Sequence, residues 1–269
     1  FDTTILGSNP SAPAKIMKKQ ISKTNIVRRI KEILFPFYRS KELKKIFNTL
    51  EKDQPKKKIV AMFVGGCVRK YILKEKIDDI DIATIFSPNE IKSKFKEDNQ
   101  VRVLETGIDH GTVTLLINNS NFELTTLRKD LKTDGRHAEV EFTDDWKEDS
   151  KRRDFTINAI YLDKKGKIFD PQLGVADLNH RIIKFIGDPD KRISEDYLRI
   201  IRFIRFSLYY NYTNFESSVI QEIKLNLTGI QNISKERILS ELIKILELKN
   251  IKNIFINSEL RVIFSNIFP

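Results

Sequence analysis

The sequence predicts an α+β fold, with a small sheet and its helices in the first part of the chain and helices alone in the second. Two observations lead to this prediction. Between about residues 59 and 128, short β-favouring runs alternate with turn residues and one helical stretch. From Leu178 onward, apolar residues recur almost everywhere at the period of a helix. Segregated strands and helices of this kind are typical of the α+β class.

The first elements alternate helix and strand. Residues 40–52 space their apolar side chains as an amphipathic helix, for which Ser40 is a candidate N-cap. A lysine run then leads into residues 59–64, IVAMFV, an apolar run typical of a buried strand. Residues 87–98 predict a second helix, because SPNE supplies a capping box with proline at the first helical position.

Further strands, a loop and the helical part follow. Strands are predicted at residues 101–107, 110–119 and 121–128, the last ending at Arg128, which gives a sheet of four or five strands. Residues 132–151 are polar and acidic with few core residues, so we expect a mobile loop there. Regular structure returns with RRDFTINAIYLD, and amphipathic helices are predicted at residues 198–210, 215–227 and 235–250.

Composition narrows the classes of function. The chain of 269 residues has a formal net charge of +11, which favours a polyanionic partner, although a soluble lysine-rich protein would show the same excess. A single cysteine, Cys67, excludes an internal disulfide and a cysteine-cluster zinc site. We therefore expect a reducing compartment, the cytoplasm, with the mitochondrial matrix as the alternative because the N-terminal segment is basic and poor in acids. No apolar run approaches the roughly 20 residues that span a bilayer, so no membrane partner is expected.

The segment FVGGCVRKYILKEKIDDIDIAT, residues 63–84, suggests a phosphate site beside a metal site. Gly65 and Gly66 would let the backbone turn and present N–H groups to phosphate oxygens, and Arg69 follows one helical turn later. Asp79 and Asp81 lie two residues apart on a β-favouring background, so a strand would turn both carboxylates to one face. Mg²⁺ prefers carboxylate oxygens together with substrate phosphates. The alternatives are a structural turn and an acidic surface turn. The preceding acid, Asp78, would face the other way, toward solvent.

A second group of polar residues lies in KRRDFTINAI. Arg152 and Arg153 suit a phosphate clamp. Asp154, and Asn158 one turn later, could serve as a further metal ligand or hold a ribose hydroxyl. A local charge pair explains the same residues equally well.

A third group lies on the predicted helix SEDYLRIIRFIRF. Asp196, Arg199, Arg202 and Arg205 recur every third residue, among apolar side chains that should bury much of the helix. Partly buried like charges need anionic or hydrogen-bonding partners. An acceptor at Asp196 and a forked donor at Arg199 complement the edge of cytosine or adenine, so the helix could read an incoming base without a template. A structural salt-bridge helix is the alternative.

Taken in order, five blocks of the sequence resemble the bacterial-type tRNA nucleotidyltransferases, or CCA-adding enzymes, which form a class II group with the bacterial poly(A) polymerases. The blocks are GGCVRK…DIDIAT, GIDHGTVTL, FELTTLRKDLKTDGRHAEVEFT, RRDFTINAI and the stretch from FDPQLG to FIRF. The resemblance extends from about Ser40 to about Glu247.

The resemblance implies a polymerase β-like nucleotidyltransferase head with a small mixed sheet, followed by an all-α neck and a partial body. The implied domains are a basic, partly disordered leader at 1–39, the head at 40–165, the neck with its nucleotide-reading helix at 166–232, and the start of the body at 233–269.

The resemblance also implies a reaction and roles for single residues. The reaction is template-independent addition of C, C and A to the 3′ end of tRNA, with CTP and ATP as substrates and Mg²⁺ as cofactor. The roles carried over by position are triphosphate contacts from Gly66 and Arg69, metal binding by Asp79 and Asp81, phosphate and ribose contacts from Arg153 and Asp154, and a nucleotide pocket formed by Asp196, Arg199, Arg202 and Arg205.

The chain departs from the family at three places. Lys70 and Tyr197 stand where the family usually has aspartate and proline, and the chain stops at Pro269, where relatives continue into a helical body and tail. A loop at residues 132–146 resembles the CCA-adding branch, since enzymes that add only CC tend to lack it. The alternatives are a poly(A) polymerase that adds A tails to RNA and a truncated, inactive remnant that binds RNA or nucleotide.

Overall fold

The computed structural model describes residues 36–108, 111–133 and 138–268. The chain divides into two units, residues 1–37 and 38–269. Most of the predicted leader, residues 1–35, lies outside the described residues. So do residues 109–110, at the start of the strand predicted at 110–119, and residues 134–137, within the predicted loop.

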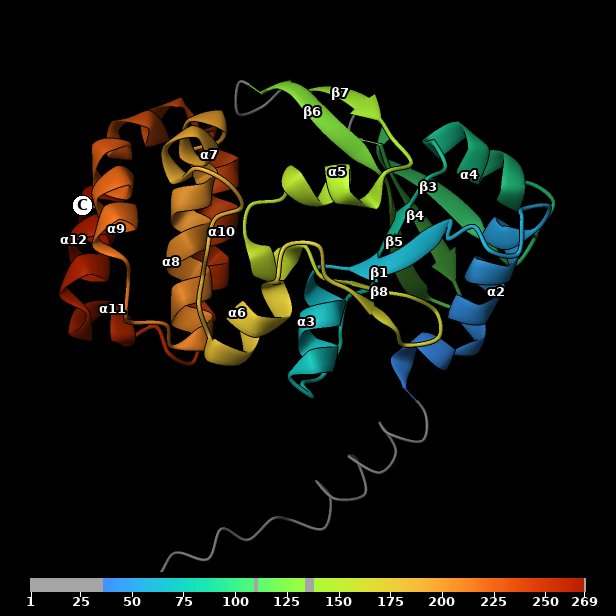
Figure 1. The fold of residues 1–269 in the computed structure, drawn as a ribbon, viewed down its shortest axis with the longest axis horizontal. Helices are drawn as coiled ribbons and strands as arrows, with labels where there is room; N and C mark the ends of the chain where they lie inside the picture. Colours follow the sequence, from blue (N-terminus) through green and yellow to red (C-terminus); the bar gives the residue numbers. More distant parts are fainter. Residues whose placement is uncertain (1–35, 109–110, 134–137, 269) are drawn as a thin grey trace, which may run out of the picture. The chain divides into compact units, whose positions relative to one another are not determined.

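The second unit has strands and helices in its first part and helices alone in its second part (Figure 1). Its elements up to the last strand are η1 (Phe37–Arg39), α2 (Lys41–Glu51), β1 (Ala61–Val64), α3 (Gly66–Ile72), β2 (Asp81–Thr84), α4 (Pro88–Phe95), β3 (Arg102–Gly107), β4 (Thr112–Ile117), β5 (Ser120–Thr126), β6 (Arg128–Thr133), β7 (Ala138–Phe142), α5 (Trp146–Lys151), η3 (Thr156–Asn158), β8 (Tyr161–Leu162) and β9 (Ile168–Phe169). The helices that follow are α6 (Gly174–His180), α7 (Pro189–Glu195), α8 (Leu198–Tyr210), α9 (Ser217–Leu225), η4 (Leu227–Asn232), α10 (Lys235–Leu246), α11 (Asn253–Ile256) and α12 (Ser258–Ile267).

The strands form a seven-stranded mixed sheet in the order β3-β4-β5-β2-β1-β8-β9. β2 and β5 are parallel and the other neighbours are antiparallel. The sequence predicted four or five strands, and the structure has five up to Thr126, with β8 and β9 extending the sheet beyond β1. The predicted α+β class is confirmed.

Strand β1 lies inside the sheet and is buried on both faces, which explains its unbroken apolar run. Met62 and Val64 pack in a core cluster with Tyr161 on one face. The ring of Phe63 lies 5.0 Å from that of Phe47 on α2, between the ring centroids, on the other face. This packing fixes the end of β1, and with it the glycine turn that follows.

Two helix starts confirm the sequence signals. Ser40 accepts a hydrogen bond from the Leu43 N–H at the start of α2. At α4, Ser87 and Glu90 form the complete capping box, with Pro88 in the first turn.

Two predictions in the middle of the chain are wrong. The strand predicted to end at Arg128 ends at Thr126, and Arg128 begins β6. The segment 132–151, expected to be a loop, contains β7 and α5. β6 and β7 form a separate two-stranded sheet, so their polar side chains need no large core.

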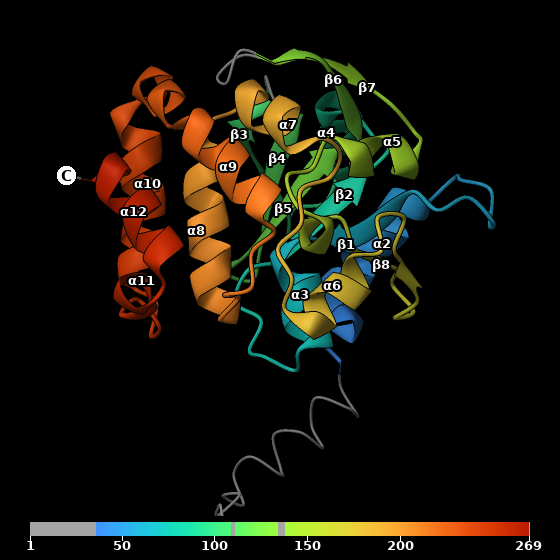
Figure 2. The same cartoon turned by 60° about the vertical axis from the view of Figure 1, so that its left-hand side comes forward.

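The helical part confirms the amphipathic pattern, with α8, α9 and α10 inside the three predicted ranges. Helix α10 packs along α8, as both views show (Figures 1 and 2). No helix among the described residues has the length and apolar character needed to cross a bilayer.

Candidate active site

The glycine turn and the aspartates meet at the end of β1. Gly65 has a φ of 72°, a conformation that glycine adopts without steric cost, and it directly precedes α3. A Cβ added at Gly65 would lie 3.3 Å from Asp81 Oδ2. The backbone N–H of Gly66 donates a hydrogen bond to the Asp81 carboxylate. The predicted phosphate turn and the predicted metal ligand are therefore adjacent.

The three acids of the DDID segment lie in different surroundings. Asp81 is the first residue of β2 and pairs with Val64. Strand β2 starts after Asp79, so the expectation that one strand carries both aspartates is wrong, and Asp79 is exposed. Asp78 is exposed as predicted, and its carboxylate lies 3.2 Å from Lys70 Nζ and 2.9 Å from Lys76 Nζ.

The charges around Asp81 suit a cation. Burial raises the pKa of the Asp81 carboxyl; Arg153 and Arg69 oppose the rise, and Asp79 adds to it. Glu123 on β5 is the parallel partner of Asp81, and its pKa is raised by burial and then by Asp81 and Asp79. Mutual repulsion among these carboxylates would be relieved by a bound cation.

The carboxylates near the glycine turn suit a metal ion that takes only one or two ligands from the protein. In the described part of the chain, no three histidine, cysteine, aspartate or glutamate side chains are arranged to enclose a metal ion. Mg²⁺ is commonly held by one or two carboxylates, with substrate phosphates and water completing its octahedron. Asp79 and Asp81 match that pattern. Glu123 was missed from the sequence, because its position beside Asp81 depends on the parallel pairing of β2 and β5.

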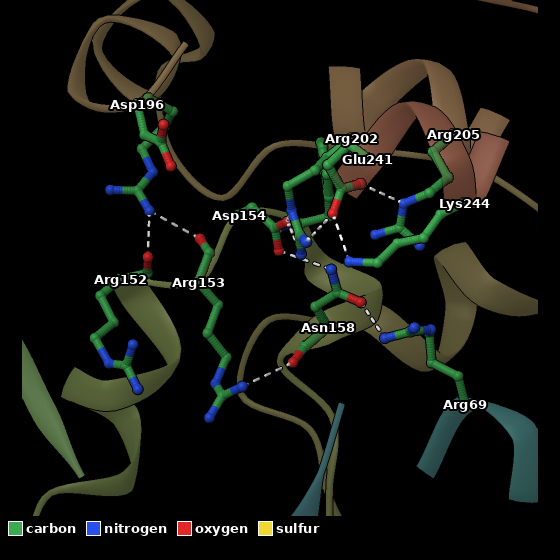
Figure 3. A network of polar contacts seen from close by, with 12 residues as sticks. Arg69, Arg152, Arg153, Asp154, Asn158, Asp196, Arg202, Arg205, Glu241 and Lys244 are labelled. Carbon is green, nitrogen blue, oxygen red and sulfur yellow. Dashed lines mark hydrogen bonds and ion pairs between the residues drawn. The ribbon is translucent and has the colours of Figure 1, made fainter. Parts of the chain in front are cut away.

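A chain of hydrogen bonds links the glycine turn to α8 (Figure 3). Arg69 Nη1 donates to Asn158 Oδ1, and Asn158 Nδ2 donates to Asp154 Oδ1 over 2.7 Å. Arg202 donates through both Nε and Nη2 to Asp154 Oδ2, each over 2.7 Å. Although burial alone would raise it, the pKa of Asp154 lies well below the usual range because Arg202 and Asn158 stabilise the carboxylate.

Two of the α8 arginines share a partner that the sequence did not reveal. Arg205 Nε donates to Glu241 Oε2 over 2.6 Å, and Arg202 Nη1 lies 3.6 Å from Glu241 Oε1. The guanidinium carbons of Arg69, Arg202 and Arg205 lie 4.9, 5.6 and 4.2 Å from the centroid of the Phe206 ring. Three cations thus gather around one aromatic ring, an arrangement that ring electrons favour.

Arg152 and Arg153 are held by a buried carboxylate. Asp149 on α5 accepts from Arg152 Nε over 2.8 Å, from Arg153 Nη2 over 3.0 Å and from the Tyr161 hydroxyl over 2.7 Å. Its side chain is fully buried. Burial raises the pKa of Asp149, but Arg153 and Arg152 hold it well below the usual range. Asp149 fell within the predicted loop and was therefore not recognised.

The junction of α7 and α8 carries the remaining predicted residues. Asp196 Oδ1 accepts from the Leu198 N–H over 3.2 Å. Arg199 Nη1 donates to Glu195 Oε2 over 2.7 Å and to the carbonyl of Arg192. Arg192 Nη2 in turn donates to the carbonyls of Arg152 and Arg153. This places the α7–α8 junction beside the arginine pair that follows α5.

The structure therefore connects most of the predicted residues into one polar network. Gly65, Gly66, Arg69 and Arg153 lie around Asp81 at one end, and Asn158, Asp154, Arg202 and Arg205 form the middle. Arg199 and Asp196 lie at the other end, which Arg192 joins to the carbonyls of Arg152 and Arg153. Sequence reasoning missed Glu123, Asp149, Arg192, Glu195, Arg237 and Glu241. Buried arginines predict that carboxylate partners exist but do not indicate where in the chain they lie.

Comparisons with known proteins point to one family. Residues 61–184 match the poly A polymerase head domain. The chain is 43% identical over 184 residues to a mitochondrial CCA tRNA nucleotidyltransferase 1 of Danio rerio, which covers 68% of this chain and 43% of the relative. It is 40% identical over 199 residues to a CCA-adding enzyme of Staphylococcus haemolyticus, covering 73% of this chain and 48% of the relative. The chain thus spans less than half the length of these relatives.

A solved structure agrees with the sequence relatives. The CCA-adding enzyme of Bacillus stearothermophilus in complex with CTP superposes with a TM-score of 0.67 and 34% identity, over 78% of this chain and 49% of that chain. Family model, relatives and fold are mutually consistent: residues 61–184 carry a poly A polymerase head domain, and the chain is similar to CCA-adding enzymes over about half of their length.

Proposed function

We propose that this chain carries the nucleotidyl-transfer site of an enzyme that adds C, C and A to the 3′ end of tRNA from CTP and ATP, with Mg²⁺ as cofactor. The strongest support is the continuous network from the Asp81 turn through Arg69, Asn158 and Asp154 to Arg202. Such a network would hold a phosphate-binding end and a base-reading end in fixed relation. The CTP complex of the Bacillus relative supports the same assignment.

The phosphate end would work as follows. Asp79 and Asp81 would hold Mg²⁺, which, when bound, would neutralise triphosphate charge and lower the pKa of the primer 3′-hydroxyl. Backbone N–H groups at Gly65 and Gly66, together with Arg69, would bind the triphosphate. The 3′-hydroxyl would lose its proton to water, its oxygen would form a bond to the α-phosphorus, and the bond from that phosphorus to pyrophosphate would break. Arg152 and Arg153, oriented by Asp149, would add positive charge on the phosphate side.

The base end would select the nucleotide. Asp196 would accept a hydrogen bond from the amino group of cytosine or adenine, and Arg199 would donate to ring acceptors. Asp154 and Asn158 would hold the ribose. The segment 132–146, which includes β7, would assist the switch from CTP to ATP.

We infer a reducing compartment for the protein. The single cysteine, Cys67, is buried, and burial raises its pKa to about 11, which suppresses reactivity. The Danio rerio relative is named as mitochondrial and the Staphylococcus relative is bacterial. Both names fit a cytoplasmic or mitochondrial matrix location.

The test is extension of tRNA that lacks its CCA end, with Mg²⁺ and with each nucleotide alone and in combination. We expect CTP to be added first and ATP after two cytidines. The variants Asp79→Ala and Asp81→Ala should lose at least about a thousandfold in the rate of nucleotide addition, because each removes a carboxylate proposed to hold the Mg²⁺ that nucleotidyl transfer needs.

Other outcomes would replace the proposal. Long A tails on unrelated RNA without use of CTP would identify a poly(A) polymerase. Nucleotide binding with no product, unaffected by the two aspartate variants, would identify an inactive binding remnant.

A further inference from the structure

Helix α10 presents a charged face to α8 and to the α7–α8 junction. Arg237, Glu241 and Lys244 are spaced four and three residues apart, so they lie on one face of the helix. Figure 3 shows Glu241 and Lys244 beside Arg202 and Arg205. None of the reaction roles proposed above uses this face.

Glu241 anchors α10 to α8. Its side chain is 4% exposed and accepts from Arg205 Nε over 2.6 Å and from Lys244 Nζ over 3.0 Å. Burial raises the pKa of Glu241, but Arg205 and Arg202 lower it below its usual value, so the group is a carboxylate at neutral pH. The helix is thereby held at a fixed position against α8.

Arg237 uses this fixed position to reach the α7–α8 junction. Its Nη2 donates to Asp196 Oδ2 over 2.7 Å, while Asp196 Oδ1 accepts from the Leu198 N–H. Each oxygen of the Asp196 carboxylate therefore accepts a hydrogen bond from the protein, and the two bonds together fix the orientation of the carboxylate plane. A carboxylate has about four acceptor positions, so capacity remains for a ligand.

We propose that Arg237 is a specificity-determining positioning residue, which orients the Asp196 carboxylate so that it accepts the exocyclic amino group of a nucleobase. The inference rests on the proposed function, because it assumes that Asp196 reads the base. Cytosine presents an amino group at the position where uracil presents a carbonyl oxygen. A fixed carboxylate therefore favours CTP and repels UTP, whereas a carboxylate free to rotate discriminates less.

The test compares equilibrium binding of CTP and UTP to the full chain and to three variants. We expect Arg237→Gln to lower the ratio of CTP to UTP affinity by roughly tenfold, within the range for loss of a hydrogen bond to a charged group. Arg237→Lys keeps the charge without the forked donor and should lower the ratio by less. Lys235→Gln removes an exposed positive charge from the same helix and should leave the ratio unchanged.

Primer extension adds a second readout. In Arg237→Gln, KM for CTP should rise while addition of the wrong pyrimidine becomes detectable. An equal loss of affinity for CTP and UTP in that variant would show a merely structural role and overturn the inference. If Arg237→Gln does not fold, as judged by thermal melting, a wild-type ratio in Arg237→Lys overturns it, and a reduced ratio supports it.

The inference and the proposed function fail in different ways. A wild-type chain that prefers CTP to UTP but never extends tRNA contradicts the proposed function alone. A chain that extends tRNA correctly, with an unchanged ratio in Arg237→Gln, contradicts the inference alone.

Discussion

At the scale of the residue, the feature that organises this protein is the pairing of partly buried arginines with carboxylates from other segments. The sequence predicted that the arginines of α8 would need anionic partners, and Arg199, Arg202 and Arg205 each have one. The partners come from Glu195, Asp154 and Glu241, and only the first is near in sequence. Local spacing predicts the need, but the position of a partner depends on the fold.

Lys70 illustrates a substitution that the structure explains. It stands where the family resemblance places an aspartate, inside the glycine turn segment, and its Nζ lies 3.2 Å from Asp78, which Lys76 also contacts. An aspartate at position 70 would instead repel Asp78. The lysine therefore suits its neighbours in this chain and does not by itself argue for an inactive protein.

We predict that Lys70→Ala lowers the free energy of unfolding by less than about 1 kcal/mol, because exposed ion pairs are weak. It should leave nucleotide addition within about threefold of wild type, since the side chain points to Asp78 rather than to the carboxylates of the site. Urea denaturation and tRNA extension measure the two effects, with Lys76→Ala as the matched control. A large loss of rate in Lys70→Ala alone would assign Lys70 a role in the reaction.

At the scale of the element, local signals predicted helices well and the middle of the chain poorly. Caps at Ser40 and Ser87 and the amphipathic runs of α8 and α10 depend on neighbouring residues alone. Helix α5 also has a local signal, since Asp145 caps it and accepts from the Glu148 N–H, but it was hidden in an acidic stretch. β6 and β7 pair with each other rather than with the main sheet, so no apolar alternation marks them.

The register of the sheet could not be predicted either. The parallel pairing of β2 with β5 places Glu123 beside Asp81, although a helix and two strands separate them in sequence. The sequence therefore predicted the residues of each short motif. It did not predict partners, such as Glu123, that come from a distant segment and are brought close by the fold.

The junction of η4 with α8 provides a test at this scale. A Cβ at Gly229 would lie 2.1 Å from Cε1 of Tyr197, the N-cap residue of α8 that follows Asp196. We predict that Gly229→Ala displaces the Tyr197 ring and lowers the free energy of unfolding by about 1–3 kcal/mol, the usual effect of overpacking.

A double-mutant cycle separates this clash from other causes. Tyr197→Ala removes the ring, so Gly229→Ala should cost far less in the Tyr197→Ala background, with a coupling of at least about 1 kcal/mol. Chemical denaturation of the four proteins measures the coupling. Additive effects would mean that the tyrosine ring does not oppose the added methyl group.

At the scale of the whole molecule, buried carboxylates in ion pairs make stability depend on pH, and one of these pairs, Asp154 with Arg202, reaches helix α8. The side chain of Asp149 is fully buried with Arg152 and Arg153, and that of Asp154 is 10% exposed beside Arg202. The pKa values of both aspartates in the folded protein lie below those of unfolded aspartate. A lowered pKa contributes stability above the unfolded pKa of about 3.9, which declines as the pH falls through the folded value.

We predict that Asp149→Asn lowers the free energy of unfolding at pH 7 by about 3–5 kcal/mol, because it removes a fully buried carboxylate and leaves two partly buried guanidinium groups without that countercharge. The difference from wild type should shrink below about pH 4, where the wild-type aspartate begins to lose its own contribution. Thermal melts from pH 3 to 8 measure this. A constant difference across that range would show that the charge of Asp149 is not the cause.

The network that links Arg69 to Glu241 also has a consequence for the order of events during synthesis. Asn158 follows its partner Arg69 by 89 positions in the sequence, and Glu241 follows its partner Arg205 by 36 positions. Since the chain leaves the ribosome from its N-terminus, the glycine turn, Asp79 and Asp81 emerge well before α10. A nascent chain released before Glu241 would have its sheet but not the final counterion of α8. The ability to select a nucleotide would thus be acquired late, near the end of translation of the described residues.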